Sequence, residues 1–245
     1  MPLMRSFTLV GAAVAASLAL AAPARAQMLG APVLQNAFTN RGFTFGLDFG
    51  AGTDVQTYGG AVAWAPMSAR YQLSGGVAYI KQTNRSGTAT YGARLMVPVL
   101  DRTSAFGVAP FVGMGGANFS GINDWQIPLG ISAGYRRAVG TNGRSISAYV
   151  SPFYTWARVR ENGQTITNGL FRVSVGIDAA VHPQVGVSVG VETGKKAGQE
   201  DVGTRGTIFG VGVSYALHKP GTGVETDTPR RRNRTAVTDS TDTTP

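Results

Sequence analysis

Residues 209–217 read Phe-Gly-Val-Gly-Val-Ser-Tyr-Ala-Leu, a strict alternation of large apolar side chains with small ones. Successive side chains of a β-strand point to opposite faces of the sheet, so this period of two predicts a strand with one bulky apolar face and one face of small residues. The same alternation occurs over residues 171–181 and 185–192. No sustained stripe of helical period interrupts the region from residue 43 to 217, which therefore predicts an all-β domain.

Extending the same test towards the N-terminus predicts ten strands in all. They fall at residues 43–51, 57–65, 70–81, 88–99, 105–116, 125–137, 145–158, 168–181, 185–193 and 206–217. The second and third are the weakest, because Gly60 and Gly75 interrupt their apolar faces. Eight strands remain the alternative to ten.

The polarity of the two strand faces indicates which solvent each face meets. A soluble barrel or sandwich turns its bulky face inward and places charges outside. Here the opposite faces are mainly Gly, Ala, Ser and Thr with few charges, which suits a narrow lumen better than a surface in water. Lipid accepts the bulky face, and only a closed barrel leaves no unpaired strand edge in hydrocarbon. The pattern predicts a closed antiparallel transmembrane β-barrel, with a soluble exported β-barrel as the alternative.

Aromatic residues and connection lengths give the expected orientation. With the first strand running outward, one set of aromatic residues falls near the outer ends of strands and another near the inner ends. The outer set is Tyr58, Tyr79, Tyr91, Trp125, Trp156 and Phe171, and the inner set is Phe43, Trp64, Tyr71, Phe106, Tyr135 and Tyr215. Two aromatic girdles are typical of membrane barrels. We expect longer outer connections, at residues 52–56, 82–87, 117–124, 159–167 and 194–205, and shorter periplasmic ones, at 66–69, 100–104, 138–144 and 182–184.

The predicted barrel, residues 43–217, is flanked by segments of different composition. Residues 1–26 combine Arg5, an apolar run and the site Ala24-Arg25-Ala26, which predicts a secretory signal peptide cleaved before Gln27. Residues 27–42 form a periplasmic lead-in or a plug, because Leu34 and Phe38 could occupy the lumen together with Met28, Leu29 and Val33. Residues 218–245 have too few apolar residues to order themselves and are expected to form a disordered periplasmic tail.

Composition excludes several kinds of chemistry. The chain has 245 residues, 34 of them Gly, two His and no Cys, so it has no disulfide framework and no cysteine site. His182 is expected in a periplasmic turn and His218 just past the last strand, far from any site at the outer rim. Neither the acidic pair Glu200-Asp201 nor the glycine run 113–116 has the context of a metal or phosphate site. We therefore expect no catalytic residue, no metal and no cofactor.

The signal peptide, the glycine-rich alternation and the strand from Phe209 to Leu217 together resemble the small Gram-negative outer-membrane β-barrels of the OmpA and OmpX kind. The resemblance implies a monomer in the outer membrane, among lipid and lipopolysaccharide, inserted by the barrel-assembly machinery. It implies no nucleic-acid partner, despite the basic cluster at residues 230–234. The chain departs from the pattern by continuing beyond Leu217, where such barrels usually end on an aromatic residue.

Six charged residues fall on the small-residue face and form a candidate charge network in the lumen. They are Asp48, Arg94, Arg136, Arg172, Asp178 and Glu192. Charges of both signs can pair inside a barrel, whereas an arginine facing lipid is costly. We expect Arg172 and Glu192 to lie nearly opposite each other and to pair. The network either holds the interior together or forms a gate or selectivity ring, and the inward Phe111, Tyr149 and Phe153 narrow the lumen.

Basic residues gather at the predicted outer rim. Lys81, Arg85, Arg158, Arg160, Lys195, Lys196 and Arg205 face a smaller set of acids, Asp54, Asp124, Glu161, Glu200 and Asp201. The excess either binds lipopolysaccharide phosphates or is a solvated rim. Taken together, these features predict a non-enzymatic barrel with a structural surface role or a narrow passive channel. The alternative is an adhesin or ligand-binding surface protein that acts through its outer loops.

Overall fold

The structure is a computed structural model that describes Leu34 and residues 36–52, 55–66, 70–83, 86–101, 104–119, 122–140, 143–161, 163–194 and 206–217. The predicted signal peptide, the first part of the lead-in and the predicted tail from residue 218 lie outside these ranges. No helix in the described ranges is long and apolar enough to cross a membrane.

The described residues form a closed barrel of ten strands, so the alternative of an eight-stranded barrel is wrong. They are β1 (Gly42–Gly52), β2 (Val55–Ala65), β3 (Gln72–Gln82), β4 (Thr88–Met96), β5 (Phe106–Phe119), β6 (Ile122–Val139), β7 (Arg144–Glu161), β8 (Gln164–His182), β9 (Val185–Gly194) and β10 (Ile208–Ala216). The two weakest predictions are present as β2 and β3. Their glycines do not break the ladder, because each strand is paired on both sides.

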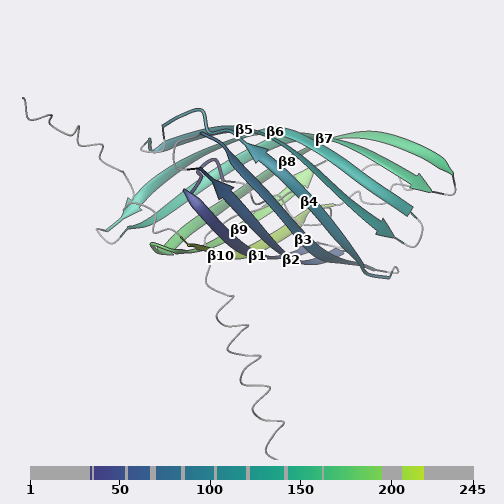
Figure 1. Ribbon diagram of the computed structural model, residues 1–245, viewed down its shortest axis with the longest axis horizontal. Helices are drawn as coiled ribbons and strands as arrows, with labels where there is room; N and C mark the ends of the chain where they lie inside the picture. The colour runs from purple at the N-terminus through teal and green to yellow at the C-terminus, as the bar shows by residue number, and fades with distance from the viewer. Residues whose placement is uncertain are drawn as a thin grey trace, which may run out of the picture.

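The strands close into a single antiparallel barrel, as predicted. Each strand pairs with its neighbours in sequence, and β1 completes the ring by pairing with β10 from Thr44↔Ala216 to Gly52↔Ile208. Figure 1 shows the strands wrapping obliquely around one closed wall. We call the end where β1 begins and β10 ends the terminal rim, and the opposite end the far rim. Closure pairs both edges, which is the requirement for crossing hydrocarbon with strands.

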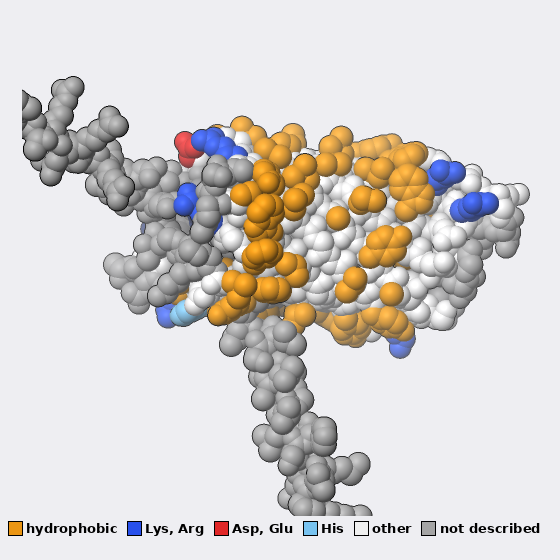
Figure 2. Space-filling model, in the orientation of Figure 1, with side chains coloured by type: hydrophobic (Ala, Val, Ile, Leu, Met, Phe, Trp, Pro, Cys, Tyr) orange, Lys and Arg blue, Asp and Glu red, His pale blue; other side chains and the backbone are white. Residues whose placement is uncertain are grey.

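The outward face of the barrel is a band of exposed large apolar side chains. Val77, Phe209 and Phe106 have exposed fractions of 66%, 65% and 63%. In Figure 2 the visible face carries these hydrophobic side chains over its middle, with Lys and Arg near its two ends. Exposure of so many large apolar side chains around one barrel is unfavourable in water. The barrel therefore spans a membrane, and the soluble alternative is rejected.

Aromatic pairs mark both borders of the apolar band. Near the far rim, Trp125 and Trp156 pack edge to face at 5.0 Å between ring centroids. Near the terminal rim, Phe106 packs against Tyr135 at 5.2 Å, and Trp64 lies between Phe43 and Tyr71. The predicted sorting of aromatic residues by depth is confirmed. Two such girdles locate the headgroup regions on either side of the hydrocarbon.

The predicted difference in connection length is wrong for most of the far rim. Residues expected in the loops 117–124 and 159–167 instead extend β5, β6, β7 and β8 into tight hairpins. Their backbones pair almost to the tips, at Phe119↔Ile122 and Glu161↔Gln164. At this rim the β9–β10 connection separates its two strands by the most residues, and residues 195–205 of it lie outside the described ranges. At the far rim the chain therefore extends beyond the apolar band mainly as paired strands and not as long loops.

The lipid-facing band predicts a strong dependence of stability on depth. Leu47 lies on the outward face near the middle of β1 and is 43% exposed. Leu47→Arg should lower the free energy of unfolding by about 2–4 kcal/mol, because it places a charge in hydrocarbon. Thr165→Arg, on the exposed β7–β8 hairpin, is the matched control and should change it by less than about 0.5 kcal/mol. Urea unfolding in lipid vesicles measures both, and equal losses would contradict a membrane band.

Candidate functional site in the barrel lumen

The inward faces of the strands are lined mainly by small residues, and larger side chains fill the lumen in layers. Buried inward positions include Ala61, Ala63, Ala109, Ser132, Ser151, Ser174 and Ser214. These leave space inside the ring of strands, which other side chains must fill or which water must occupy.

An apolar cluster crosses the lumen towards the far rim. Its buried members are Val55, Ile80, Ala117, Val159 and Ile208, from β2, β3, β5, β7 and β10, with Ile122 packed against them. Ile80 and Ile208 have exposed fractions of 0%. Because these strands come from opposite parts of the ring, the cluster bridges the barrel from wall to wall. We call it the far apolar cluster.

Sequence reasoning missed this cluster. Ala117 and Val159 were expected in loops, and Val55 in the first outer connection. In the structure all three continue the inward-facing alternation of their strands. The signal was the parity of Ile80 and Ile208, which lie beside the outward Tyr79 and Phe209 and therefore point inward.

A second apolar cluster fills the lumen closer to the terminal rim. It consists of Ala37, Met96, Ala109, Phe111 and Phe153. The two phenyl rings lie 6.2 Å apart between centroids. We call it the inner apolar cluster. It confirms that Phe111 and Phe153 narrow the lumen, and Tyr149, also predicted to do so, is buried nearby on β7.

Gly130 on β6 makes room for the two rings of the inner apolar cluster. A Cβ at residue 130 would lie 2.8 Å from Phe111 Cζ and 2.5 Å from Phe153 Cβ. A side chain there would clash with Phe153 Cβ and with the Phe111 ring.

Part of the lead-in lies inside the barrel. Leu34 and Ala37 are each 1% exposed, and Asn36 Nδ2 donates a 2.7 Å hydrogen bond to Ser147 Oγ on β7. Phe38 stacks under the guanidinium of Arg136, with 4.5 Å from Arg136 Cζ to the ring centroid. These contacts place Leu34 and residues 36–40 against the inner wall. The other predicted plug residues, Met28, Leu29 and Val33, lie outside the described ranges.

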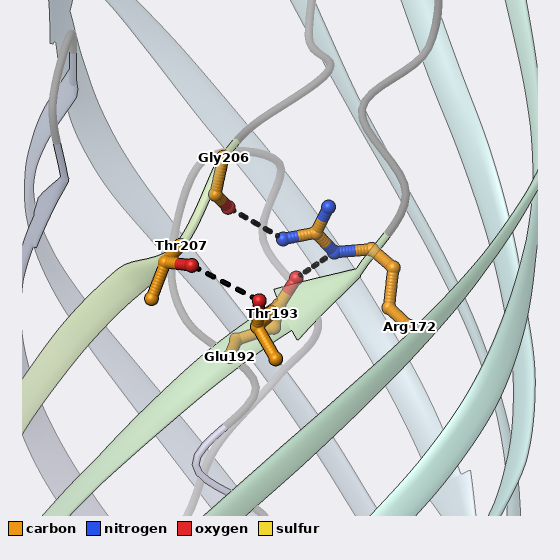
Figure 3. Close-up of polar contacts among 5 residues, drawn as sticks. All are labelled: Arg172, Glu192, Thr193, Gly206 and Thr207. Carbon is orange, nitrogen blue, oxygen red and sulfur yellow. Dashed lines mark hydrogen bonds and ion pairs between the residues drawn. The ribbon is translucent and has the colours of Figure 1, made fainter.

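The ion pair expected between Arg172 and Glu192 is present (Figure 3). Arg172 Nε lies 2.5 Å from Glu192 Oε1, and Arg172 Nη2 donates a 3.0 Å hydrogen bond to the carbonyl of Gly206. Both side chains are almost completely buried. The two residues are diagonal neighbours rather than opposite ones, because Arg172 is in register with Gly194 and Glu192 with Ser174.

The backbone around this ion pair leaves room for the Arg172 side chain to extend to Glu192 and Gly206. A Cβ at Gly194 would lie 2.8 Å from Arg172 Cγ, so a glycine there leaves the path of the arginine side chain open. Thr193 Oγ1 and Thr207 Oγ1 lie 3.0 Å apart and join β9 to the chain just before β10 (Figure 3). Together the two contacts secure both ends of the β9–β10 connection.

Arg136 and Asp178 lie together near the terminal rim. Both are in register with Ser147, from β6 on one side and β8 on the other. They line a cavity of about 60 Å³ with Asn36, Phe38 and Ser145. Such a polar space has room for ordered water.

The remaining two members of the predicted network, Arg94 and Asp48, are on other strands. Arg94 on β4 is buried, with its Cζ 6.0 Å from the centroid of the Phe111 ring. Asp48 on β1 is in register with Gly59 and Gly212. The structure therefore joins Arg172 to Glu192 directly and places Arg136 with Asp178, while Arg94 and Asp48 lie on other strands.

Potential catalytic groups are sparse in the described ranges. His182 ends β8 at the terminal rim, where its Nδ1 accepts a hydrogen bond from the backbone N–H of Gln184 at 3.3 Å. His218 and the acidic pair Glu200-Asp201 lie outside these ranges. Among the residues described, no group of three His, Cys, Asp or Glu side chains could hold a metal ion. The expectation that the chain is not an enzyme stays a prediction.

No family model and no curated protein matches the chain. Among solved structures, the β domain of the Bordetella autotransporter BrkA is similar with a TM-score of 0.48 and 12% identity, covering 71% of this chain and 98% of that chain. Neisserial surface protein A has a TM-score of 0.36 at 14% identity, covering 72% and 98%. LpxR from Salmonella typhimurium has a TM-score of 0.36 at 10% identity, covering 66% and 73%. Similarity this distant assigns no activity, so the function is argued from the geometry.

The buried ion pair predicts a large cost when one partner is neutralised. Glu192→Gln should lower the free energy of unfolding by about 3–5 kcal/mol, because it leaves the Arg172 charge buried without its counter-charge. Asp101→Asn is the matched control. It breaks the exposed Arg70–Asp101 pair, 2.6 Å long with side chains 63% and 70% exposed, and should cost less than about 1 kcal/mol. Replacing Arg172 and Glu192 together by Met should recover most of the loss in the same urea titration, and equal costs at both sites would contradict the assignment.

Proposed function

We propose that the chain is an integral outer-membrane β-barrel with a structural role at the cell surface, and that its lumen is closed to solutes. The observation that carries the proposal is the filling of the lumen by two apolar clusters. A barrel that conducts needs a continuous polar path, whereas one that serves as a structural element needs a packed interior.

The far apolar cluster is the stronger of the two barriers. Its isoleucines are withdrawn from solvent, so an ion entering from the far rim would lose its water without gaining ligands. Hydrophobic constrictions of this kind exclude ions even without a complete steric block. The inner apolar cluster and the lead-in form a second barrier behind it.

The charges in the lumen support a structural role. A selectivity ring needs charges that face a water-filled path at one level. Here Arg172 is engaged by Glu192 and by the Gly206 carbonyl. Arg136 and Asp178 lie near the terminal rim, away from that pair. The charges hold strands and connections together rather than select ions.

The topology supports the outer membrane as the location. The start of β1 and the end of β10 both lie at the terminal rim, where an exported chain with a signal peptide would leave them in the periplasm. The far rim, with its raised hairpins, then faces outward. Girdles of aromatic residues at both borders fit this placement.

Surface contact is a second candidate function, favoured by the β7–β8 hairpin. Residues 163–167 at its tip are exposed on both faces, so the hairpin has left both the lipid and the lumen. Its ladder remains paired to Glu161↔Gln164, which gives the tip a rigid base. Such an element can present residues to another surface. The loop expected to act as an adhesin, 194–205, lies mainly outside the described ranges.

The closed lumen predicts an electrically silent barrel. The purified chain, inserted in planar bilayers, should give no stepwise conductance at moderate voltage, because ions cannot cross the far apolar cluster. Insertion is checked on the same sample by heat-modifiable migration on gels. Stepwise ion currents from inserted protein would reject the closed lumen and favour the narrow passive channel.

The structural role is tested in cells. Cells that lack the chain should become more sensitive to detergent and to osmotic shock, and expression of the wild type should restore resistance. Leu47→Arg, expected to destabilise the barrel, should restore it less well than Thr165→Arg. Unchanged sensitivity in cells lacking the chain would argue against a structural role and would favour surface contact.

A further inference from the structure

The outward face of β7 changes from apolar to aromatic to cationic along one line. Its outward side chains towards the far rim are Val150, Tyr154, Trp156, Arg158 and Arg160. Tyr154 is 51% and Trp156 40% exposed, and both arginines are exposed. This order matches the change from hydrocarbon through the interface to the phosphate level of a lipid leaflet.

Among the residues that the structure describes, the ladder neighbours of the two arginines on this face carry no acidic group. Arg158 is in register with Trp125 on β6 and Thr167 on β8, and Arg160 with Asn123 and Thr165. The side chain of Asp124 is buried on the inward face. Two cations therefore share one face without a carboxylate beside them in the ladder. Their Cα atoms are about 7 Å apart, the distance of alternate residues on a strand.

The arginines stand on a fixed scaffold rather than on a loop. Both are paired within a three-stranded part of the wall formed by β6, β7 and β8. On the same face Arg158 has Trp125 beside it in register and Trp156 two residues away, and these two rings pack edge to face. A site built on paired strands holds its donors with less loss of conformational entropy on binding.

We propose that Arg158 and Arg160 form a binding site for the phosphate groups of a phosphorylated glycolipid of the outer leaflet. The lipid chains would lie against Tyr154, Trp156 and the apolar band below, and the two guanidinium groups would take the phosphate oxygens. Arginine suits this ligand because its planar fork donates paired hydrogen bonds to phosphate. The inference rests on the proposed location and orientation in the outer membrane, not on the closed lumen.

The opposite rim supplies a matched control. Arg137 and Arg144 are also exposed and outward, near the ends of β6 and β7 at the terminal rim. They are diagonal neighbours, because Arg137 is in register with Ile146 and Arg144 with Val139. If phosphate binding needed only two outward arginines, both pairs would serve equally. The far-rim pair differs in having Trp125 beside Arg158 and Trp156 two residues away on the same face.

The experiment measures lipid retained by the purified full-length chain. The protein in detergent is mixed with bis-phosphorylated lipid A, passed through a sizing column and examined by native mass spectrometry. Wild type should retain the lipid, and the variant R158Q/R160Q should bind it at least tenfold more weakly. R137Q/R144Q should bind like wild type. R158K/R160K should fall between, because lysine keeps the charge but loses the paired hydrogen bonds.

Two further arms identify the ligand chemistry. Dephosphorylated lipid A should bind wild type no better than it binds R158Q/R160Q, and inorganic phosphate should not displace the bound lipid. Equal retention of lipid A by wild type and R158Q/R160Q would overturn the proposal. Binding of dephosphorylated lipid A to wild type as tightly as bis-phosphorylated lipid A would overturn it too. Displacement by inorganic phosphate would replace the lipid site with a site for free phosphate.

Folding and the proposed function are controlled separately. Each variant must keep heat-modifiable migration, and R158K/R160K tests the site with the charge retained. Conductance in planar bilayers would reject the closed lumen and leave lipid retention unaffected. Loss of lipid retention in R158Q/R160Q with silent bilayers would support both conclusions.

Discussion

The pairing of β1 with β10 is the constraint on which the rest of the structure depends. In hydrocarbon every backbone N–H and C=O must find a partner within the protein, and an open sheet would leave two edges without one. The register from Thr44↔Ala216 to Gly52↔Ile208 removes both edges at once. Once the ring is closed, each residue has only two environments. Outward positions meet lipid and become large and apolar, while inward positions are shielded and can hold small, polar or paired charged side chains.

Closure also creates the packing problem that the interior solves. A ring of ten strands encloses more volume than Ala, Ser and Gly side chains can fill. The chain fills it with Phe111 and Phe153, with Leu34 and the neighbouring lead-in residues, and with the far apolar cluster. Gly130 shows that the small residues are part of this fit, because a Cβ there would clash with Phe153 Cβ and the Phe111 ring. The closed lumen that we propose rests on this packing and not on any single residue.

The alternation of large and small residues predicted most of the strands of the barrel but little of the packing inside the lumen. It located ten strands, separated their faces and placed Arg172 close to Glu192, because parity and hairpin register are local properties of the chain. It could not show that Ile80 and Ile208 meet, since that contact depends on the curvature of a barrel. It also failed at residues 117–124 and 159–167, where Asn and Gly resemble loop signals. Ala117 and Val159 do continue the inward alternation, but both faces are exposed at the tip, residues 163–167, so the contrast between large and small residues is lost there.

The positions of the arginines indicate where the hydrocarbon-facing part of the barrel surface ends. An arginine facing hydrocarbon costs about 2–4 kcal/mol at the midplane, so each arginine must turn inward or stand outside the band. Arg172 turns inward, where Glu192 and the Gly206 carbonyl compensate its charge. Arg158 and Arg160 stand outside the apolar band, on the same outward face as Trp156 but beyond it. The position on β7 where Trp156 gives way to Arg158 therefore marks the edge of the hydrocarbon. An outward-facing pair of arginines on β7 is unfavourable anywhere within the hydrocarbon. The proposed phosphate site is therefore expected just beyond this edge.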